Sequence, residues 1–153
     1  MKTKVVLDVS FPVSRHAVLK NNKQIRKNRR TGQVFIGSND KVIEAKENML
    51  NYLEKYKKEY RIKAVSNPVH VIFKFYFTDF YVKTGKNEGK KSKRIPDLSN
   101  LYQLPEDCLE NALIIKDDAQ IIAHDGSRAL PSLKDYNYIE IKVLELIGQS
   151  INY

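Results

Sequence analysis

Residues 69–77 read Val-His-Val-Ile-Phe-Lys-Phe-Tyr-Phe, the most regular alternation in the chain. Large apolar side chains occupy every second position, while the positions between them are mixed and include His70 and Lys74. A period of two places alternate side chains on opposite faces of a strand, and β-branched and aromatic residues favour strands. We therefore expect a strand well inside a sheet, preceded by a break at Asn67-Pro68.

Residues 40–59 carry the clearest helical pattern. Apolar side chains recur every three to four residues from Val42 to Tyr56, which places them on one face of a helix. The preceding polar residues, 38–40, offer side-chain oxygens for an N-terminal cap. The pattern predicts an amphipathic helix over the whole range.

Shorter patterns predict the remaining strands, over residues 5–11, 33–36, 119–123 and 138–146. A second helix is expected after Pro96, because apolar residues recur at helical spacing as far as Ala112. Pro105 lies inside that pattern and either kinks the helix or restarts it with proline in the first turn. This order of elements indicates an α/β or α+β fold: a single domain over residues 1–153, with two principal helices packed on a mixed β-sheet.

The bulk properties are those of a soluble globular protein. A length of 153 residues is typical of one domain. The single cysteine, Cys108, favours a reducing compartment, since it cannot form an internal disulfide. The first residues lack the apolar core of a signal peptide, and no apolar run approaches the roughly 20 residues that span a bilayer. We expect a cytoplasmic protein without a membrane partner.

The formal net charge is +9, and basic residues gather in two stretches, from Arg15 to Arg30 and from Lys83 to Arg94. Clustered Lys and Arg favour nucleic acid, because contacts with phosphates release condensed counterions. The alternative is a basic surface that serves solubility alone. Residues 83–93 are rich in glycine and lysine and lack any periodic pattern, so we expect an exposed, mobile basic loop there.

Acidic residues interrupt this basic chain at Asp97 and at Asp117-Asp118. Each position alone is ordinary, since aspartate is common at helix caps and in turns before strands. The expected order of elements, however, allows both positions to meet at one edge of the sheet. Converging carboxylates repel one another unless a cation joins them, and oxygen ligands suit Mg²⁺ or Mn²⁺. The sequence has no Cys/His set with zinc spacing and no Walker-type phosphate loop.

Two motifs carry a family resemblance: Pro96-Asp97-Leu98-Ser99-Asn100-Leu101 and Asp117-Asp118-Ala119-Gln120-Ile121-Ile122. With their separation of about twenty residues, they resemble the RusA-type Holliday-junction resolvases that phages, prophages and bacteria encode. The resemblance covers nearly the whole chain and implies a RusA-like fold. It also implies a homodimeric, Mg²⁺-dependent endodeoxyribonuclease, with Mn²⁺ as a substitute ion, that makes paired nicks in four-way DNA junctions during recombination and repair.

The resemblance also assigns metal ligands, and the neighbouring acidic and basic residues add further candidates. Asp97 and Asp118 match metal ligands of the family, and Asp117 lies beside them as a further catalytic candidate. Asp125 is a nearby candidate for a replacement ligand, whereas Asp107 is expected to be a solvated helix residue. The residues expected to contact DNA are Lys91, Lys93, Arg94, Asn100, Arg128, Arg15, Arg29 and Arg30.

Two departures from the family pattern leave alternatives open. Ser99 stands where the pattern has a second aspartate, and Gln103 stands where it has a lysine. Loss of a carboxylate and a cation favours a catalytically inactive protein of the same fold that binds branched DNA. A third hypothesis is a basic RNA-binding protein whose aspartates only cap helices and turns.

Overall fold

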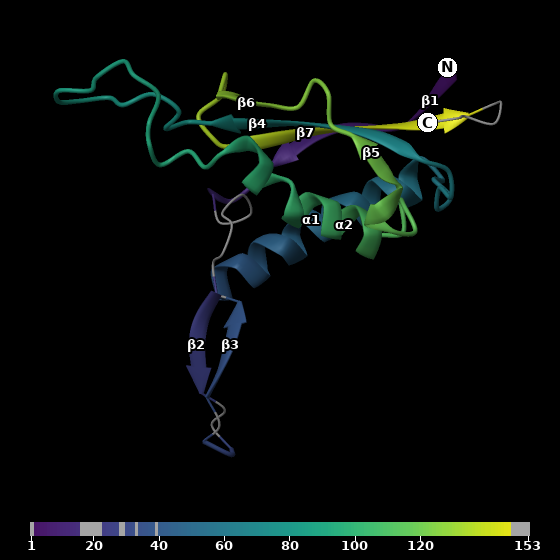
Figure 1. The fold of residues 1–153 in the computed structure, drawn as a ribbon, viewed down its shortest axis with the longest axis horizontal. Coiled ribbons are helices and arrows are strands. Elements are labelled where there is room, and N and C mark those ends of the chain that lie inside the picture. Colours follow the sequence, from purple (N-terminus) through teal and green to yellow (C-terminus); the bar gives the residue numbers. More distant parts are fainter. Residues whose placement is uncertain (1, 16–22, 28–29, 33, 39, 148–153) are drawn as a thin grey trace.

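The computed structural model describes residues 2–15, 23–27, 30–32, 34–38 and 40–147. Its centre is a five-stranded mixed sheet, shown edge-on in Figure 1. β1 (Lys2–Pro12) pairs antiparallel with β7 (Tyr138–Ile147), which pairs antiparallel with β4 (Val69–Phe77). β5 (Ile121–Ala123) and β6 (Arg128–Pro131) both run parallel to β4, beside successive parts of it. The expected mixed sheet is confirmed.

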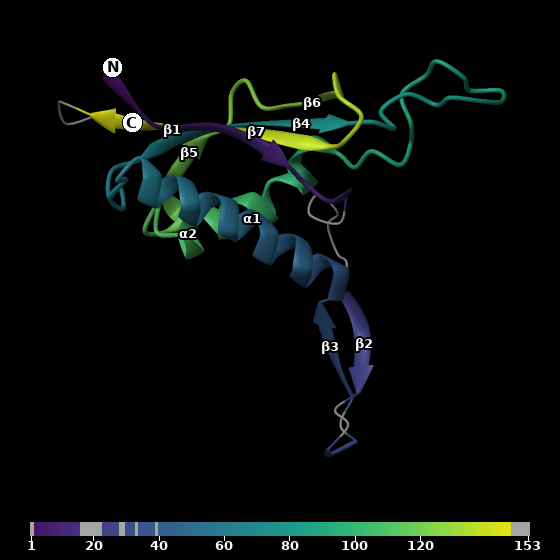
Figure 2. The same cartoon turned by 180° about the vertical axis from the view of Figure 1, so that it is seen from behind.

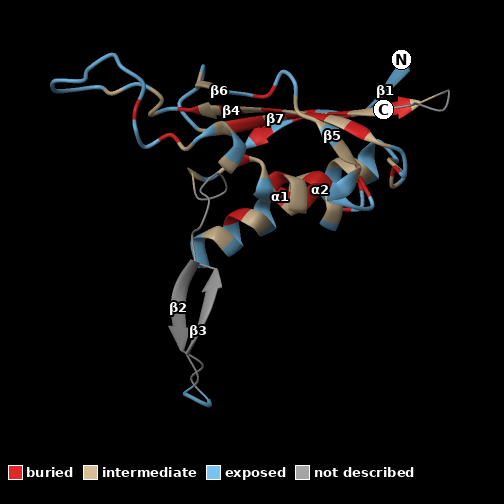
Figure 3. Cartoon of the chain, viewed as in Figure 1, coloured by how far each residue is buried: buried red, intermediate tan, exposed pale blue. Residues whose placement is uncertain are grey.

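The core lies between this sheet and two helices. In β4 every second side chain is buried, as the alternation predicts, and the phenylalanines at 73, 75 and 77 are at most 2% exposed. α1 (Asp40–Glu59) and α2 (Gln103–Asn111) lie on the same side of the sheet (Figures 1 and 2). Figure 3 shows the buried residues along the strands and on the sides of the helices that face them. α1 covers the range that the sequence predicts, with Ala45, Met49 and Leu53 buried.

The second helix begins later than the sequence pattern indicates. A 3-10 turn, η2 (Leu98–Leu101), precedes α2, so Pro105 falls in the first turn of α2. The helix therefore restarts instead of kinking, because proline lacks the N–H that an interior position would need. The strand expected at 119–123 is also shorter, since a second 3-10 turn, η3 (Asp118–Gln120), precedes β5.

The sequence patterns predict neither β2 (Lys23–Lys27) nor β6, whereas the strand expected at 33–36 is present as β3 (Val34–Ser38). β2 pairs antiparallel with β3 to form a hairpin that projects from the body in Figure 1. β6 is four residues long and ends in proline, so its sequence carries little strand signal. Both strands are recognisable only through their pairing partners.

Residues 81–91, which we name the lysine arm, form a second projecting hairpin (Figure 1). Tyr81 pairs with Lys91, and the Val82 N–H donates to the carbonyl of Lys90 over 2.9 Å. Gly89 has a φ of +82° and donates back to Val82, a conformation that glycine adopts at low cost. Of the residues expected to be exposed, 83–93, those from Lys83 to Lys91 and Lys93 are exposed and Ser92 is buried, while the sequence pattern gives no sign of the backbone pairing.

In the part of the chain that the structure describes, no helix is both long enough and apolar enough to cross a membrane.

The buried face of β4 makes a direct stability prediction. Phe73 is fully buried, and its replacement by alanine should lower the free energy of unfolding by about 3–5 kcal/mol, measured by urea denaturation. Ile72 is half-buried on the opposite face of the same strand, so Ile72→Ala should cost clearly less. Equal losses for the two variants would contradict the assignment of the core face.

Candidate metal centre

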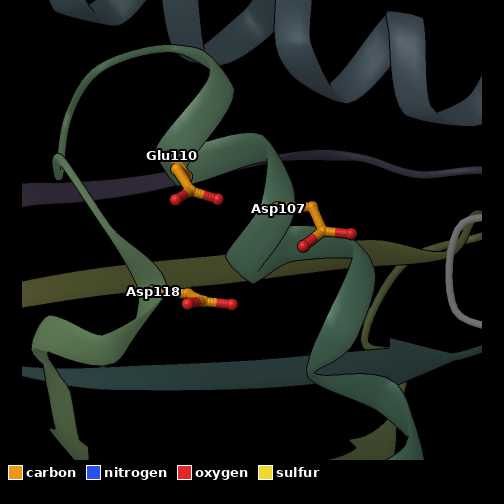
Figure 4. A group of neighbouring side chains, drawn as sticks. All are labelled: Asp107, Glu110 and Asp118. Atoms are coloured by element: carbon orange, nitrogen blue, oxygen red, sulfur yellow. The ribbon is translucent and has the colours of Figure 1, made fainter.

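Three carboxylates converge beside α2. Asp107 and Glu110 project from α2, and Asp118 opens η3; their ligand oxygens lie within 4.8 Å of one another (Figure 4). The spacing of three residues puts Asp107 and Glu110 on one helical face. Both are half-buried and Asp118 is exposed, so the cluster opens to solvent. An oxygen-only set of this kind suits Mg²⁺ or Mn²⁺.

Gln120 holds the turn that carries Asp118. Its Oε1 accepts the N–H groups of Lys116 and Asp117, over 2.7 and 2.8 Å. Its Nε2 donates to the carbonyls of Val65 and Asn67, over 2.7 and 2.9 Å, in the segment just before β4. One amide side chain therefore ties both ends of the turn to the body of the protein. This contact explains why glutamine suits the fourth position of the Asp-Asp-Ala-Gln motif.

The two adjacent aspartates have different roles. The Asp117 side chain accepts the Ala119 N–H over 2.8 Å and caps η3. The pKa of Asp118 is raised, first by a side-chain hydrogen bond with Asp117, then by desolvation and by the negative charges of Asp117, Glu106 and Asp107. Asp118 thus lies where negative charge accumulates, and a cation bound there would relieve the repulsion.

A histidine braces the helix that supplies two of the carboxylates. His124 Nε2 lies 2.7 Å from Glu106 Oε1 in the first turn of α2, and His124 Nδ1 donates to the Val71 carbonyl over 3.0 Å. The ring also stacks on Tyr102, with 4.1 Å between centroids. These contacts fix the start of α2 against the end of β5. Cys108, on the opposite side of α2, is fully buried, and burial raises the pKa of its thiol to about 12.

Other residues from the sequence motifs lie outside the cluster. Asp97 is exposed before η2, and its side chain makes no capping hydrogen bond there. Asp125 is exposed in the turn after β5, where its carbonyl accepts from His70. Neither carboxylate belongs to the group of three. Conversely, the sequence predicts that Asp107 is a solvated helix residue and gives no role to Glu110, whereas both are half-buried members of the group of three. Their spacing on one face of a helix was the available signal.

The model of a known protein family, Endodeoxyribonuclease RusA, matches residues 14–143. The chain belongs to the RusA family. Comparison with curated proteins gives no match. Membership in a family of DNA endonucleases gives the three carboxylates a chemical context, because phosphodiester hydrolysis by such enzymes commonly uses divalent cations held by carboxylates.

Both departures from the RusA pattern lie near the start of α2. Ser99 is exposed in η2, and Gln103 is the exposed first residue of α2. Gln103 precedes Asp107 by four positions, so the two occupy the same helical face. The carboxylates of Asp107 and Glu110 are therefore supplied from the face on which the family pattern has its lysine.

The basic residues expected to contact DNA are dispersed. Lys91, Lys93 and Arg94 are exposed, on the lysine arm and just after it. Arg15 is engaged within the protein: Nη1 donates to Asp79 over 2.6 Å.

The others lie on three further parts of the molecule. Arg128 pairs in register with Lys74 and, with Lys142, lines an open hollow on the sheet face away from the helices. Asn100 is half-buried in η2 and Arg30 is exposed, while Arg29 lies outside the described residues. Lys93 and Arg94 are thus the exposed basic residues that lie nearest in sequence to the motif beginning at Pro96.

Proposed function

We propose that this protein is a divalent-metal-dependent endodeoxyribonuclease that resolves four-way DNA junctions. The observation that carries the proposal is the convergence of Asp107, Glu110 and Asp118 in a chain of the RusA family. A formal net charge of +9 supports a polyanionic substrate, and carboxylates gathered within such a chain support a metal that meets phosphate.

The cluster passes a simple test of fit for Mg²⁺ or Mn²⁺. All its donors are carboxylate oxygens, and the oxygens are close enough for one ion to share. Such an ion, when bound, supplies a water of lowered pKa and positive charge for the scissile phosphate. Asp107, Glu110 and Asp118 would hold it. We propose Asp97, which lies in the first family motif, and Asp125 as further ligands of the ion.

Protein groups around the cluster have supporting roles in this proposal. Asp117 and Gln120 keep the η3 turn in place, so that the Asp118 carboxylate faces α2. Lys93 and Arg94 hold phosphates next to the cut, and Asn100 and Arg128 are proposed as further DNA contacts. A two-fold homodimer would present two such centres to a symmetric junction, which matches paired nicking.

The test is nicking of a synthetic four-way junction in Mg²⁺ or Mn²⁺. We expect paired nicks in opposite strands, no nicks in EDTA, and weaker cleavage of a linear duplex of the same arm sequence. Cleavage of linear duplex at the same rate would contradict junction specificity. Equal cleavage in EDTA would contradict metal dependence.

Ser99 and Gln103 favour a second candidate, a branched-DNA-binding protein without catalysis. An uncharged serine and an uncharged amide stand where the family pattern has a carboxylate and an ammonium group. Tight junction binding in EDTA, combined with no nicking in either metal, would select this candidate. Restoring Ser99→Asp and Gln103→Lys together should then produce nicking.

A further inference from the structure

We propose that the lysine arm is a preorganised element that binds the phosphate backbone of duplex DNA away from the cut, and that Arg15 sets its direction. This inference rests on the proposed function, since it takes DNA as the substrate. It adds a second contact surface, separate from the acidic cluster, and a residue that positions it.

The arm is a hairpin whose side chains are free to face DNA. Every residue from Lys83 to Lys91 is exposed, and this stretch holds four lysines and one glutamate. Backbone hydrogen bonds close the hairpin, among them Gly89 N–H to the Val82 carbonyl over 2.9 Å. The tip of the arm is a turn, in which the N–H groups of Glu88 and Lys90 donate to the carbonyls of Gly85 and Asn87 over 3.2 and 3.0 Å.

Arg15 clamps the two ends of the arm together. Its Nη1 donates to Asp79, just before the arm, over 2.6 Å. Its Nη2 donates to the carbonyl of Arg94, just after the arm, over 2.7 Å. The guanidinium also lies over the Phe77 ring at the end of β4, 5.6 Å from the centroid. A single planar cation thus joins the sheet and both ends of the arm.

Buried residues at the base complete the attachment. Ser92 is 7% exposed; its N–H donates to the Phe80 carbonyl over 2.8 Å, and its hydroxyl accepts the Arg94 N–H over 3.2 Å. Ile95 is 4% exposed and donates to the Ser92 carbonyl. The chain passes from this anchored base directly to Asp97. The direction of the arm and the position of the first motif are therefore set by the same contacts.

Preorganisation matters energetically because a flexible lysine loop would lose conformational freedom on binding. A clamped hairpin has already lost much of that freedom on folding. Its lysines then contribute mainly through counterion release, which appears as a steep dependence of affinity on salt.

The first experiment neutralises the arm. Lys86→Gln, Lys90→Gln and Lys91→Gln are combined, and the Kd for a four-way junction is measured by fluorescence anisotropy in EDTA. Three lost phosphate contacts should reduce the slope of log K against log salt by about 2.7. Raising the salt from about 50 to about 200 mM lowers the affinity of both proteins for the junction. This drop in affinity should be roughly 40-fold smaller for the arm variant than for the parent protein.

The matched control removes the same charge elsewhere. Lys4, Lys58 and Lys63 are exposed on β1, at the end of α1 and on the loop after it, at the end of the molecule away from the arm (Figure 1). Their combined change to glutamine should leave the slope nearly unchanged. An unchanged slope in the arm variant, or an equal loss in the control, would overturn the proposal. Because EDTA prevents metal-dependent cleavage, the result is independent of nicking, which tests the proposed function separately.

A second variant separates the clamp from simple charge. Asp79→Ala removes the acid together with its acceptor oxygen and so releases Nη1 of Arg15, and an Arg15 that contacted DNA directly would then bind the junction more tightly. A clamping Arg15 predicts the opposite: several-fold weaker binding and faster hydrogen exchange at the hairpin amides of Val82 and Gly89. Tighter binding with unchanged exchange would show that Arg15 does not position the arm.

Discussion

Replacing Asp118 with asparagine should slow nicking of a four-way junction in Mg²⁺ by at least about 1,000-fold, because a bound cation contributes several kcal/mol to stabilising charge at the scissile phosphate. Junction binding in EDTA should remain near that of the parent protein. The rate is measured under single-turnover conditions, which isolate the chemical step. We expect this large effect at Asp118 because, of the aspartates in the two sequence motifs, it is the one that lies with Asp107 and Glu110 in the acidic group.

The neighbouring residue provides the control. Asp117→Asn keeps an Oδ1 atom that can accept the Ala119 N–H, so the η3 cap should survive. We expect its nicking rate to stay within about tenfold of the parent rate. Loss of a residue that only orients a metal ligand commonly lowers activity by about that factor or more. Equal losses for the two variants would contradict the separate roles assigned to these aspartates.

Removing the carboxylates of α2 should have the second large effect. The combination of Asp107→Asn and Glu110→Gln should weaken Mn²⁺ binding at least about 100-fold, the upper range for disrupting the surroundings of a metal. Isothermal titration calorimetry measures this directly, without DNA. Both substitutions preserve size and polarity, and both sites are only half-buried, so the fold should persist.

α1 offers a matched control for this double variant. Glu44 and Glu47 are exposed on α1 with the same spacing of three residues. Glu44→Gln combined with Glu47→Gln removes two negative charges of the same kind and should leave Mn²⁺ affinity nearly unchanged. A comparable loss would mean that Mn²⁺ responds to overall charge. Retained affinity in the α2 variant would place the ion elsewhere, and Asp97→Asn would be the next variant to measure.

The local sequence is sufficient to predict the elements that bury a regularly spaced apolar face. The alternation in β4 and the helical spacing in α1 are strong because each element packs one face against the same core. The hairpin of β2 and β3, β6 and the lysine arm depend on pairing between separate segments, which periodicity does not record. Pro105 was recognised as a break, but its place at the start of α2 depends on how η2 packs.

The candidate site was predictable only in part, for the same reason. The Asp-Asp-Ala-Gln motif indicated Asp118. The structure shows why the motif ends in glutamine, because Gln120 anchors the η3 turn by hydrogen bonds to the segment before β4. Asp107 and Glu110 look like ordinary residues of an exposed helical face until the fold places α2 beside η3. Arg15 looked like a DNA contact because its partners, Asp79 and the Arg94 carbonyl, are more than sixty residues away in sequence.

The central claim is that a divalent cation binds between α2 and η3, and anomalous scattering from a crystal grown with Mn²⁺ tests it most directly. The predicted result is a manganese peak within about 2.2 Å of a carboxylate oxygen of Asp118 and of Asp107 or Glu110. A manganese peak elsewhere in the protein, with none of these three carboxylates coordinating it, would contradict the claim.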